Sequence, residues 1–226
     1  MRQAFKEYIG SLSAGVAGAF AAAVFAASAG YAADTKLSDR ALVDALWGGG
    51  LKIYFRHAQT DWSKGDQVEK DGDWVSCDPN KMRQLSDTGR ATAERIGRAM
   101  RALKIPVAEV ISSEYCRAAE TAKHLGLGPV RTTRHIMNLR SEHYVGGHDA
   151  AVRNARAIVT AAAPAGKNVV IVGHGNLMRA ATGEYTDEAG AGVYAVRPGT
   201  PLGFETVAVI AASEWEALAV RFGGGN

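Results

Sequence analysis

Residues 168–172 are Asn-Val-Val-Ile-Val, an almost uninterrupted apolar run that limits the folds open to this chain. A strand with one face in water alternates apolar and polar residues, whereas a strand covered on both faces is apolar nearly throughout. The run therefore predicts an inner strand of a parallel sheet. Strands and helices that alternate along the chain favour the same arrangement. We expect an α/β fold, a three-layer sandwich with a mostly parallel central sheet and helices on both faces.

Other elements are expected on either side of this run. The strands are rich in β-branched and aromatic residues, and the helices repeat apolar residues every three or four positions. Strands are expected at 51–55, 107–112 and 204–211. Helices are expected at 38–47, 88–103, 114–125 and 149–163. Residues 61–83 are polar, with Trp, Gly, Asp and Pro among them, and are expected to form a long loop.

The N-terminal segment differs in composition from the rest. Arg2 and Lys6 precede a stretch rich in Ala, Gly, Val and Phe, which runs without charge over residues 8–33. This is the layout of a secretory signal peptide, with cleavage expected after Ala32, so that residues 1–32 are the signal. The alternative is an uncleaved anchor helix, because the stretch approaches the length of a membrane span. With cleavage, we expect a periplasmic or secreted protein without stable membrane insertion.

The remaining residues, 33–226, are expected to form a single domain with a motif-bearing core at about 50–211. The chain has a formal charge of +3 and 47% hydrophobic residues, and its Lys and Arg residues are scattered. That distribution lacks the basic footprint of a nucleic-acid binder, so no nucleic-acid partner is expected. Nothing in the sequence indicates an oligomeric state.

Two cysteines, Cys77 and Cys116, are the only ones in the chain. In an oxidising compartment they permit one disulfide, and two buried free thiols are the alternative. We predict the disulfide, which would tie the long loop to the helix start that carries Arg117.

Residues suited to phosphate chemistry follow three of the expected strands. Arg56 and His57 come directly after the first strand, Arg117 follows the second, and His174 follows the run at 168–172. Ligands of open α/β sheets bind beyond the carboxyl ends of the strands, so we expect these side chains to converge. The sequence thus predicts one crevice with two histidines and two arginines.

This combination matches the needs of phosphoryl transfer. Neutral imidazole can attack phosphorus, and we assign that role to His57. The planar forks of Arg56 and Arg117 suit the charged phosphoryl oxygens. His174 would donate a hydrogen bond to the transferring group.

Four segments resemble the motifs of the histidine phosphatase (phosphoglycerate mutase-like) superfamily. Residues 54–60 (Tyr-Phe-Arg-His-Ala-Gln-Thr) resemble its Arg-His-Gly-Glu signature, and 85–90 its Leu-Ser-x-x-Gly segment. Residues 111–122 resemble its Ser-Ser-x-x-x-Arg-x-x-x-Thr-Ala block, and 172–175 its second-histidine block. The four segments cover about residues 50–211, and with the expected signal peptide the chain resembles an exported bacterial-type member of that superfamily.

The resemblance implies a phosphohistidine at His57, a phosphate pocket of Arg56, Arg117 and His174, and no metal or other cofactor. The expected activity is hydrolysis of a small phosphorylated substrate, a phosphoric monoester. Two alternatives are a phosphoglycerate mutase-like phosphotransferase and a non-catalytic protein of the cell envelope that binds phosphate or a phosphorylated ligand.

The chain departs from the family's pattern at two places. Ala58 and Gln59 replace the usual Gly and acid after the first histidine. The general acid of many members lies in a Leu-x-Glu segment, where this chain has Ser141, followed by Glu142 one place late. Glu142 is the first candidate for the general acid. The alternatives are Asp61, Glu184, Glu188 or no acid at all.

Overall fold

The computed structural model describes residues 36–224. The signal peptide expected over residues 1–32 lies outside the described residues. No helix in the part that is described has the length and apolar character needed to cross a membrane.

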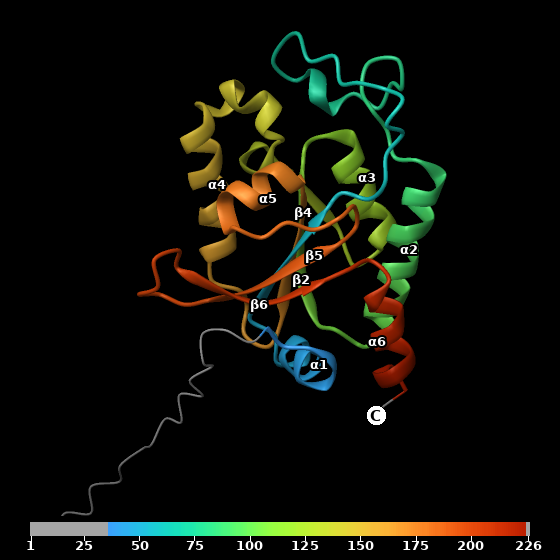
Figure 1. The fold of residues 1–226 in the computed structure, drawn as a ribbon, viewed down its shortest axis with the longest axis vertical. Coiled ribbons are helices and arrows are strands. Elements are labelled where there is room, and N and C mark those ends of the chain that lie inside the picture. Colours follow the sequence, from blue (N-terminus) through green and yellow to red (C-terminus); the bar gives the residue numbers. More distant parts are fainter. Residues whose placement is uncertain (1–35, 225–226) are drawn as a thin grey trace, which may run out of the picture. The chain divides into compact units, whose positions relative to one another are not determined.

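Helices and strands alternate through most of the described chain (Figure 1). The helices are α1 (Asp39–Gly48), α2 (Asp87–Ala102), α3 (Cys116–Leu125), α4 (His148–Thr160), α5 (Gly175–Thr182) and α6 (Glu214–Phe222). The strands are β1 (Leu51–Arg56), β2 (Val107–Ser113), β3 (Val130–Thr133), β4 (Asn168–Gly173), β5 (Ala191–Val196) and β6 (Phe204–Ile210). Short 3-10 helices span Asp73–Val75, Arg134–Ile136 and Leu139–Val145.

All six strands form one sheet in the order β3-β2-β4-β1-β5-β6. The pairs among β3, β2, β4 and β1 are parallel, and β5 and β6 are added antiparallel at one side. The predicted α/β fold with a mostly parallel sheet is therefore confirmed. Strands β3 and β5 and helices α5 and α6 were not among the expected elements.

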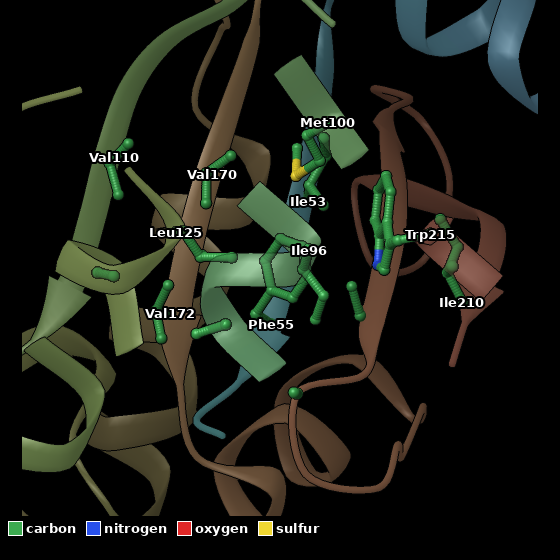
Figure 2. Close-up of a cluster of buried hydrophobic side chains, with 14 of the residues drawn as sticks. Ile53, Phe55, Ile96, Met100, Val110, Leu125, Val170, Val172, Ile210 and Trp215 are labelled. Atoms are coloured by element: carbon green, nitrogen blue, oxygen red, sulfur yellow. The ribbon is translucent and has the colours of Figure 1, made fainter. Parts of the chain in front are cut away.

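Two apolar cores cover the two faces of the sheet. Residues of β1 and β4 alternate between them: Ile53 and Val170 belong to the core under α1, α2, α3 and α6, whereas Tyr54 and Ile171 belong to the core under α4 and α5. Figure 1 shows α4 and α5 on one side of the sheet and α2, α3 and α6 on the other, and Figure 2 shows the first core, with Trp215 of α6 among its side chains. Because both faces are covered, β1 and β4 are buried along nearly their whole length, as the apolar run predicted.

Asn168 is the polar residue in the predicted apolar run, and it joins four elements at the amino end of the sheet. Its Oδ1 accepts a hydrogen bond from Leu51 N at 3.2 Å, and its Nδ2 donates to Leu46 O at 2.7 Å and Pro106 O at 3.0 Å. The side chain is fully buried. Its three hydrogen bonds satisfy the end of α1, the start of β1 and the start of β2.

The expected long loop follows β1. A disulfide joins Cys77 of this loop to Cys116, the first residue of α3, with the two Cα atoms 5.4 Å apart. The prediction of a Cys77–Cys116 disulfide is confirmed. The disulfide thereby attaches the loop to Cys116, the residue that precedes Arg117.

Candidate active site

Three residues from three strand ends meet at the carboxyl edge of the parallel strands. His57 follows β1, Arg117 lies in the first turn of α3 after β2, and His174 caps α5 after β4. The backbone N–H of His57 donates to Gly173 O at 2.8 Å, which joins the two histidine segments directly. The ring centroids of His57 and His174 are 5.4 Å apart. All three side chains are at most 3% exposed. The sequence analysis predicted that these three side chains lie close together, and they do.

The imidazole of His57 presents one defined nitrogen to the site. Its Nδ1 lies 2.9 Å from Ala58 O, and because a carbonyl can only accept, Nδ1 carries the hydrogen. The lone pair is then on Nε2, which accepts from Nε of Arg117 at 3.3 Å. Burial, and after it the charge of Arg117, lowers the pKa of His57 well below its usual value. The ring is neutral at pH 7, with Nε2 available to attack.

Arg117 is a fully buried cation with one unused donor. Its Nη1 donates to Asp66 Oδ1 at 2.9 Å, and the guanidinium lies 4.6 Å from the centroid of the Tyr115 ring. Its Nη2 has no hydrogen-bond partner among the described residues. A buried donor without a partner costs free energy, so the arrangement favours an incoming acceptor such as a phosphoryl oxygen.

A neighbouring asparagine sets the state of the second histidine. Oδ1 of Asn138 accepts from Arg140 N at 3.0 Å and Asn176 Nδ2 at 2.9 Å, so its Nδ2 faces Nδ1 of His174 at 3.3 Å. His174 therefore carries its hydrogen on Nε2, which lies 3.0 Å from Ser113 Oγ. Burial, then the charge of Arg117, lowers the pKa of His174 well below its usual value. The ring is a neutral donor inside the site.

Arg56 lies at the margin of this cluster. Its Nη1 donates to Tyr185 Oη at 2.6 Å and to Thr186 O at 3.2 Å, and its Nη2 lies 3.8 Å from Glu188. These donors face the segment between α5 and β5. Arg56 still adds positive charge near His57, because its field contributes to the lowered pKa of that ring.

Glu142, the first candidate for the general acid, is bonded to a residue outside the three central residues. A hydrogen bond of 3.1 Å joins its carboxylate to Nδ1 of His148, and within residues 36–224 none joins it to the two histidines or Arg117. Ser141, at the position expected for the family's acid, is buried and bonds Tyr115 Oη at 2.5 Å.

The three alternative acids lie in different places. Asp61 accepts from the backbone and hydroxyl of a serine two residues later, and Glu184 pairs with a lysine at the start of the described chain. Glu188 accepts from Thr60 Oγ1 at 3.2 Å and lies near Arg56. Glu188 is thus the alternative that lies near a residue of the predicted site, Arg56.

Two charged residues of the long loop reach the site without having been predicted. Asp66 binds Arg117, as described, and Arg83 is only 8% exposed, with its guanidinium 3.7 Å from the centroid of the Trp62 ring. Burial and the repulsion of Arg117 lower the pKa of Arg83. No periodicity or motif in the loop distinguishes these two residues from its other charges. Asn138 was also missed, although it directly precedes the Leu139 segment considered for the acid.

The segment after His57 is held in place by the start of α2. Backbone N of Ser86 donates to Gln59 O at 3.0 Å, and its hydroxyl donates to Gln59 Oε1 at 3.0 Å. Thr60 and Leu85 form a β-bridge. A Cβ on Gly89 would lie 2.1 Å from Gln59 O, so only glycine allows this approach. The glycine of the Leu-Ser-x-x-Gly segment therefore positions the chain that carries the nucleophile.

A groove of about 680 Å³ lies beside Arg56, and its lining does not include His57, Arg117 or His174. Trp62 and Tyr185 give it aromatic walls, and Arg95, Glu188 and Glu216 add charges of both signs. Its size and mixed lining are suited to a polar organic group attached to a phosphate.

A model of the histidine phosphatase superfamily (branch 1) matches residues 53–157, which hold His57 and Arg117 in the arrangement described above. This stretch, just under half of the chain, is similar to the histidine phosphatase superfamily. No curated protein matches the chain significantly in sequence.

Solved structures of phosphatases have the same fold. The protein histidine phosphatase SixA, complexed with tungstate, is 13% identical with a TM-score of 0.51, over 73% of this chain and 98% of that one. A mycobacterial glucosyl-3-phosphoglycerate phosphatase is 18% identical with a TM-score of 0.51, over 72% and 99%. The same mycobacterial enzyme complexed with VO3 is 17% identical with a TM-score of 0.51, over 72% and 100%. At these identities the likeness shows the fold alone.

Proposed function

We propose that the chain is a phosphomonoester hydrolase that transfers a phosphoryl group to Nε2 of His57 and then to water. Members of the superfamily are phosphatases or mutases. The observation that carries the proposal is the neutral, buried His57, whose Nε2 lies 3.3 Å from Nε of an arginine with a free buried donor. A mere anion site has no need of a nucleophile held in that position.

In the proposed reaction the residues divide the work. Nε2 of His57 attacks phosphorus as the bond to the leaving oxygen breaks. Arg117 binds the phosphoryl oxygens through Nη2, and Nε2–H of His174 donates to them. Arg56 adds positive charge at the margin. A water molecule then attacks the phosphohistidine, which releases inorganic phosphate and restores the neutral ring. No step of this sequence needs a metal ion.

A small phosphorylated molecule is the proposed substrate. The groove beside Arg56 is large enough for its organic part. The structural neighbours named above hold tungstate and VO3, and we expect this chain to bind such oxyanions at Arg117 and His174.

We further propose that the protein is exported to the periplasm or secreted, after cleavage behind Ala32. The disulfide between Cys77 and Cys116 supports this proposal, because such bonds persist in oxidising compartments and are rare in the cytosol. Detection of a mature protein that begins at residue 33 in the exported fraction would test it. Retention of the full-length chain in the cytoplasm would contradict it.

A phosphate-binding protein without turnover is the second candidate. It is favoured by Glu142, whose carboxylate is bound to His148 rather than to the cluster. A phosphoglycerate mutase-like phosphotransferase would use the same intermediate, and it is distinguished by conversion between phosphoglycerate isomers without release of free phosphate.

The test is to trap the phosphohistidine. We expect 4-nitrophenyl phosphate to be hydrolysed. Enzyme that carries labelled phosphate from the substrate should keep that phosphate under an alkaline quench and lose it under an acid quench. His57→Ala should abolish both labelling and turnover while still binding vanadate. His174→Ala should retain the nucleophile and lose about 100-fold or more in rate, the scale for one preorganised donor.

His135→Ala is the matched control, because that ring is exposed on a 3-10 turn and should leave labelling unchanged. Near-normal turnover by the His57→Ala protein would rule out attack by this residue. Tight oxyanion binding without any turnover by the parent would favour the binding protein.

A further inference from the structure

One carboxylate lies within the phosphate site, and it is not among the acids expected from the sequence. Asp66 belongs to the long loop after β1, and its side chain is 11% exposed. Its Oδ1 accepts from Nη1 of Arg117 at 2.9 Å, while Nε of the same guanidinium donates to His57 Nε2 at 3.3 Å. A single arginine therefore contacts both the proposed nucleophile and a carboxylate.

The loop that carries Asp66 is braced against the site. The same Oδ1 accepts a second hydrogen bond from the backbone N–H of Arg83 at 3.1 Å. Further along the loop, the disulfide joins Cys77 to Cys116, the residue directly before Arg117. The carboxylate thus approaches Arg117 from a segment that is covalently attached to the start of the same helix.

The carboxylates of the other candidate acids bind residues outside the three central residues. Glu142, Asp61 and Glu184 bind partners outside the cluster. Glu188 lies near Arg56, the last residue of β1, at the margin of the cluster. Among the described residues, Asp66 alone has a carboxylate on the arginine that also contacts His57.

Asp66 lies in a site that carries several positive charges. Arg117 and Arg83 are two buried or nearly buried cations, and the carboxylate offsets part of that charge. A phosphoryl group that binds Nη2 of Arg117 would bring two negative charges beside the carboxylate.

We propose that Asp66 is the general acid of the phosphatase reaction. This assignment rests on the phosphatase function proposed above. The carboxyl group of Asp66 gives its proton to the leaving oxygen as the phosphorus–oxygen bond breaks and Nε2 of His57 bonds to phosphorus. The products of this step are the free alcohol, the phosphohistidine and the Asp66 carboxylate. In the second step the carboxylate accepts a proton from the attacking water, and the phosphorus–nitrogen bond breaks to release phosphate.

The decisive experiment compares leaving groups. The mature parent, Asp66→Asn and the control Asp71→Asn are assayed on aryl phosphates that range from 4-nitrophenyl to phenyl phosphate. Asp71 lies in the same loop but is exposed and pairs with Arg134, so its substitution should have no effect. Asp66→Asn should keep 4-nitrophenyl phosphate turnover within about threefold and lose about 100-fold on phenyl phosphate, the size of a general-acid effect.

A second readout separates proton transfer from a structural role. In the parent, the rate on phenyl phosphate should fall at high pH as the acid loses its proton, and this alkaline limb should be absent in Asp66→Asn. An equal loss on every substrate, or a gain on every substrate because the carboxylate only competes with phosphate, would overturn the proposal. So would a leaving-group-dependent loss in Glu142→Gln with none in Asp66→Asn.

The parent enzyme alone also tests the proposal if the variant does not fold. A working acid makes the parent rate nearly independent of the leaving group, so a steep fall from 4-nitrophenyl to phenyl phosphate would overturn the assignment. Failure of the phosphatase function itself would be distinct: the parent would then cleave none of the aryl phosphates and form no phosphohistidine.

Discussion

Lowering the pH from 7.5 to 5.5 should destabilise the protein through the two histidines of the site. Burial lowers the pKa of both His57 and His174 well below 6.5, the value they regain in the unfolded chain. Below pH 6.5 the unfolded state therefore binds two protons that the folded state does not. The free energy of unfolding decreases as the pH is lowered. Each proton contributes roughly 1 to 1.5 kcal/mol per pH unit, so the pair should remove about 3 kcal/mol by pH 5.5.

Urea denaturation of the non-reduced mature protein, followed by tryptophan fluorescence at the two pH values, measures this loss. The variant that carries both His57→Asn and His174→Asn has no ring to protonate in either state, so its stability should depend on pH less by about the same 3 kcal/mol. His135→Asn removes an exposed ring and should behave as the parent does. If the double variant loses as much stability as the parent between pH 7.5 and 5.5, the two histidines are not held neutral by burial.

Three further predictions concern stability. Removal of the disulfide by Cys77→Ser with Cys116→Ser should lower the free energy of unfolding by about 4 kcal/mol, given its separation of 39 residues, which urea titration of both forms would measure. Gly89→Ala should lower the free energy of unfolding by about 1 to 3 kcal/mol, because its Cβ would meet backbone atoms. Gly48→Ala is the control: a Cβ there has nothing within 4 Å, so thermal melts of the two variants should show little loss for this one. Asn168→Ala should cost about 2 kcal/mol or more in urea titration, since buried backbone groups lose their partners; an unchanged midpoint would contradict that account.

Much of the fold and the centre of the site could be predicted from local patterns. The apolar run at β4 revealed a strand covered on both faces, and each site residue close to a strand end was then placed by the common direction of the parallel strands. His57, Arg117 and His174 met as expected for this reason. Arg56 is the last residue of β1, but its long side chain binds the segment before β5, and these contacts depend on tertiary neighbours.

What could not be predicted depends on contacts between distant segments. Strand β5 (Ala191–Val196) contains Ala and Gly, which have low strand propensity, and pairing with β1 and β6 gives it its conformation. Helix α6 is short, and its Trp215 is buried in the core shared with α2. Asp66 and Arg83 lie in a loop without periodicity, so only the path of the folded loop brings them to Arg117.

The position of β1 in the sheet sets an order of events during synthesis. This strand is the first to leave the ribosome, yet its two neighbours are β4 and β5, so that Lys52 pairs with Val169 and Tyr194. More than a hundred residues must be made before the nucleophile's own strand acquires any partner in the sheet. Such distant pairings form slowly and leave an apolar strand exposed to aggregation meanwhile. A nascent chain truncated before residue 168 would therefore depend on a chaperone for its solubility.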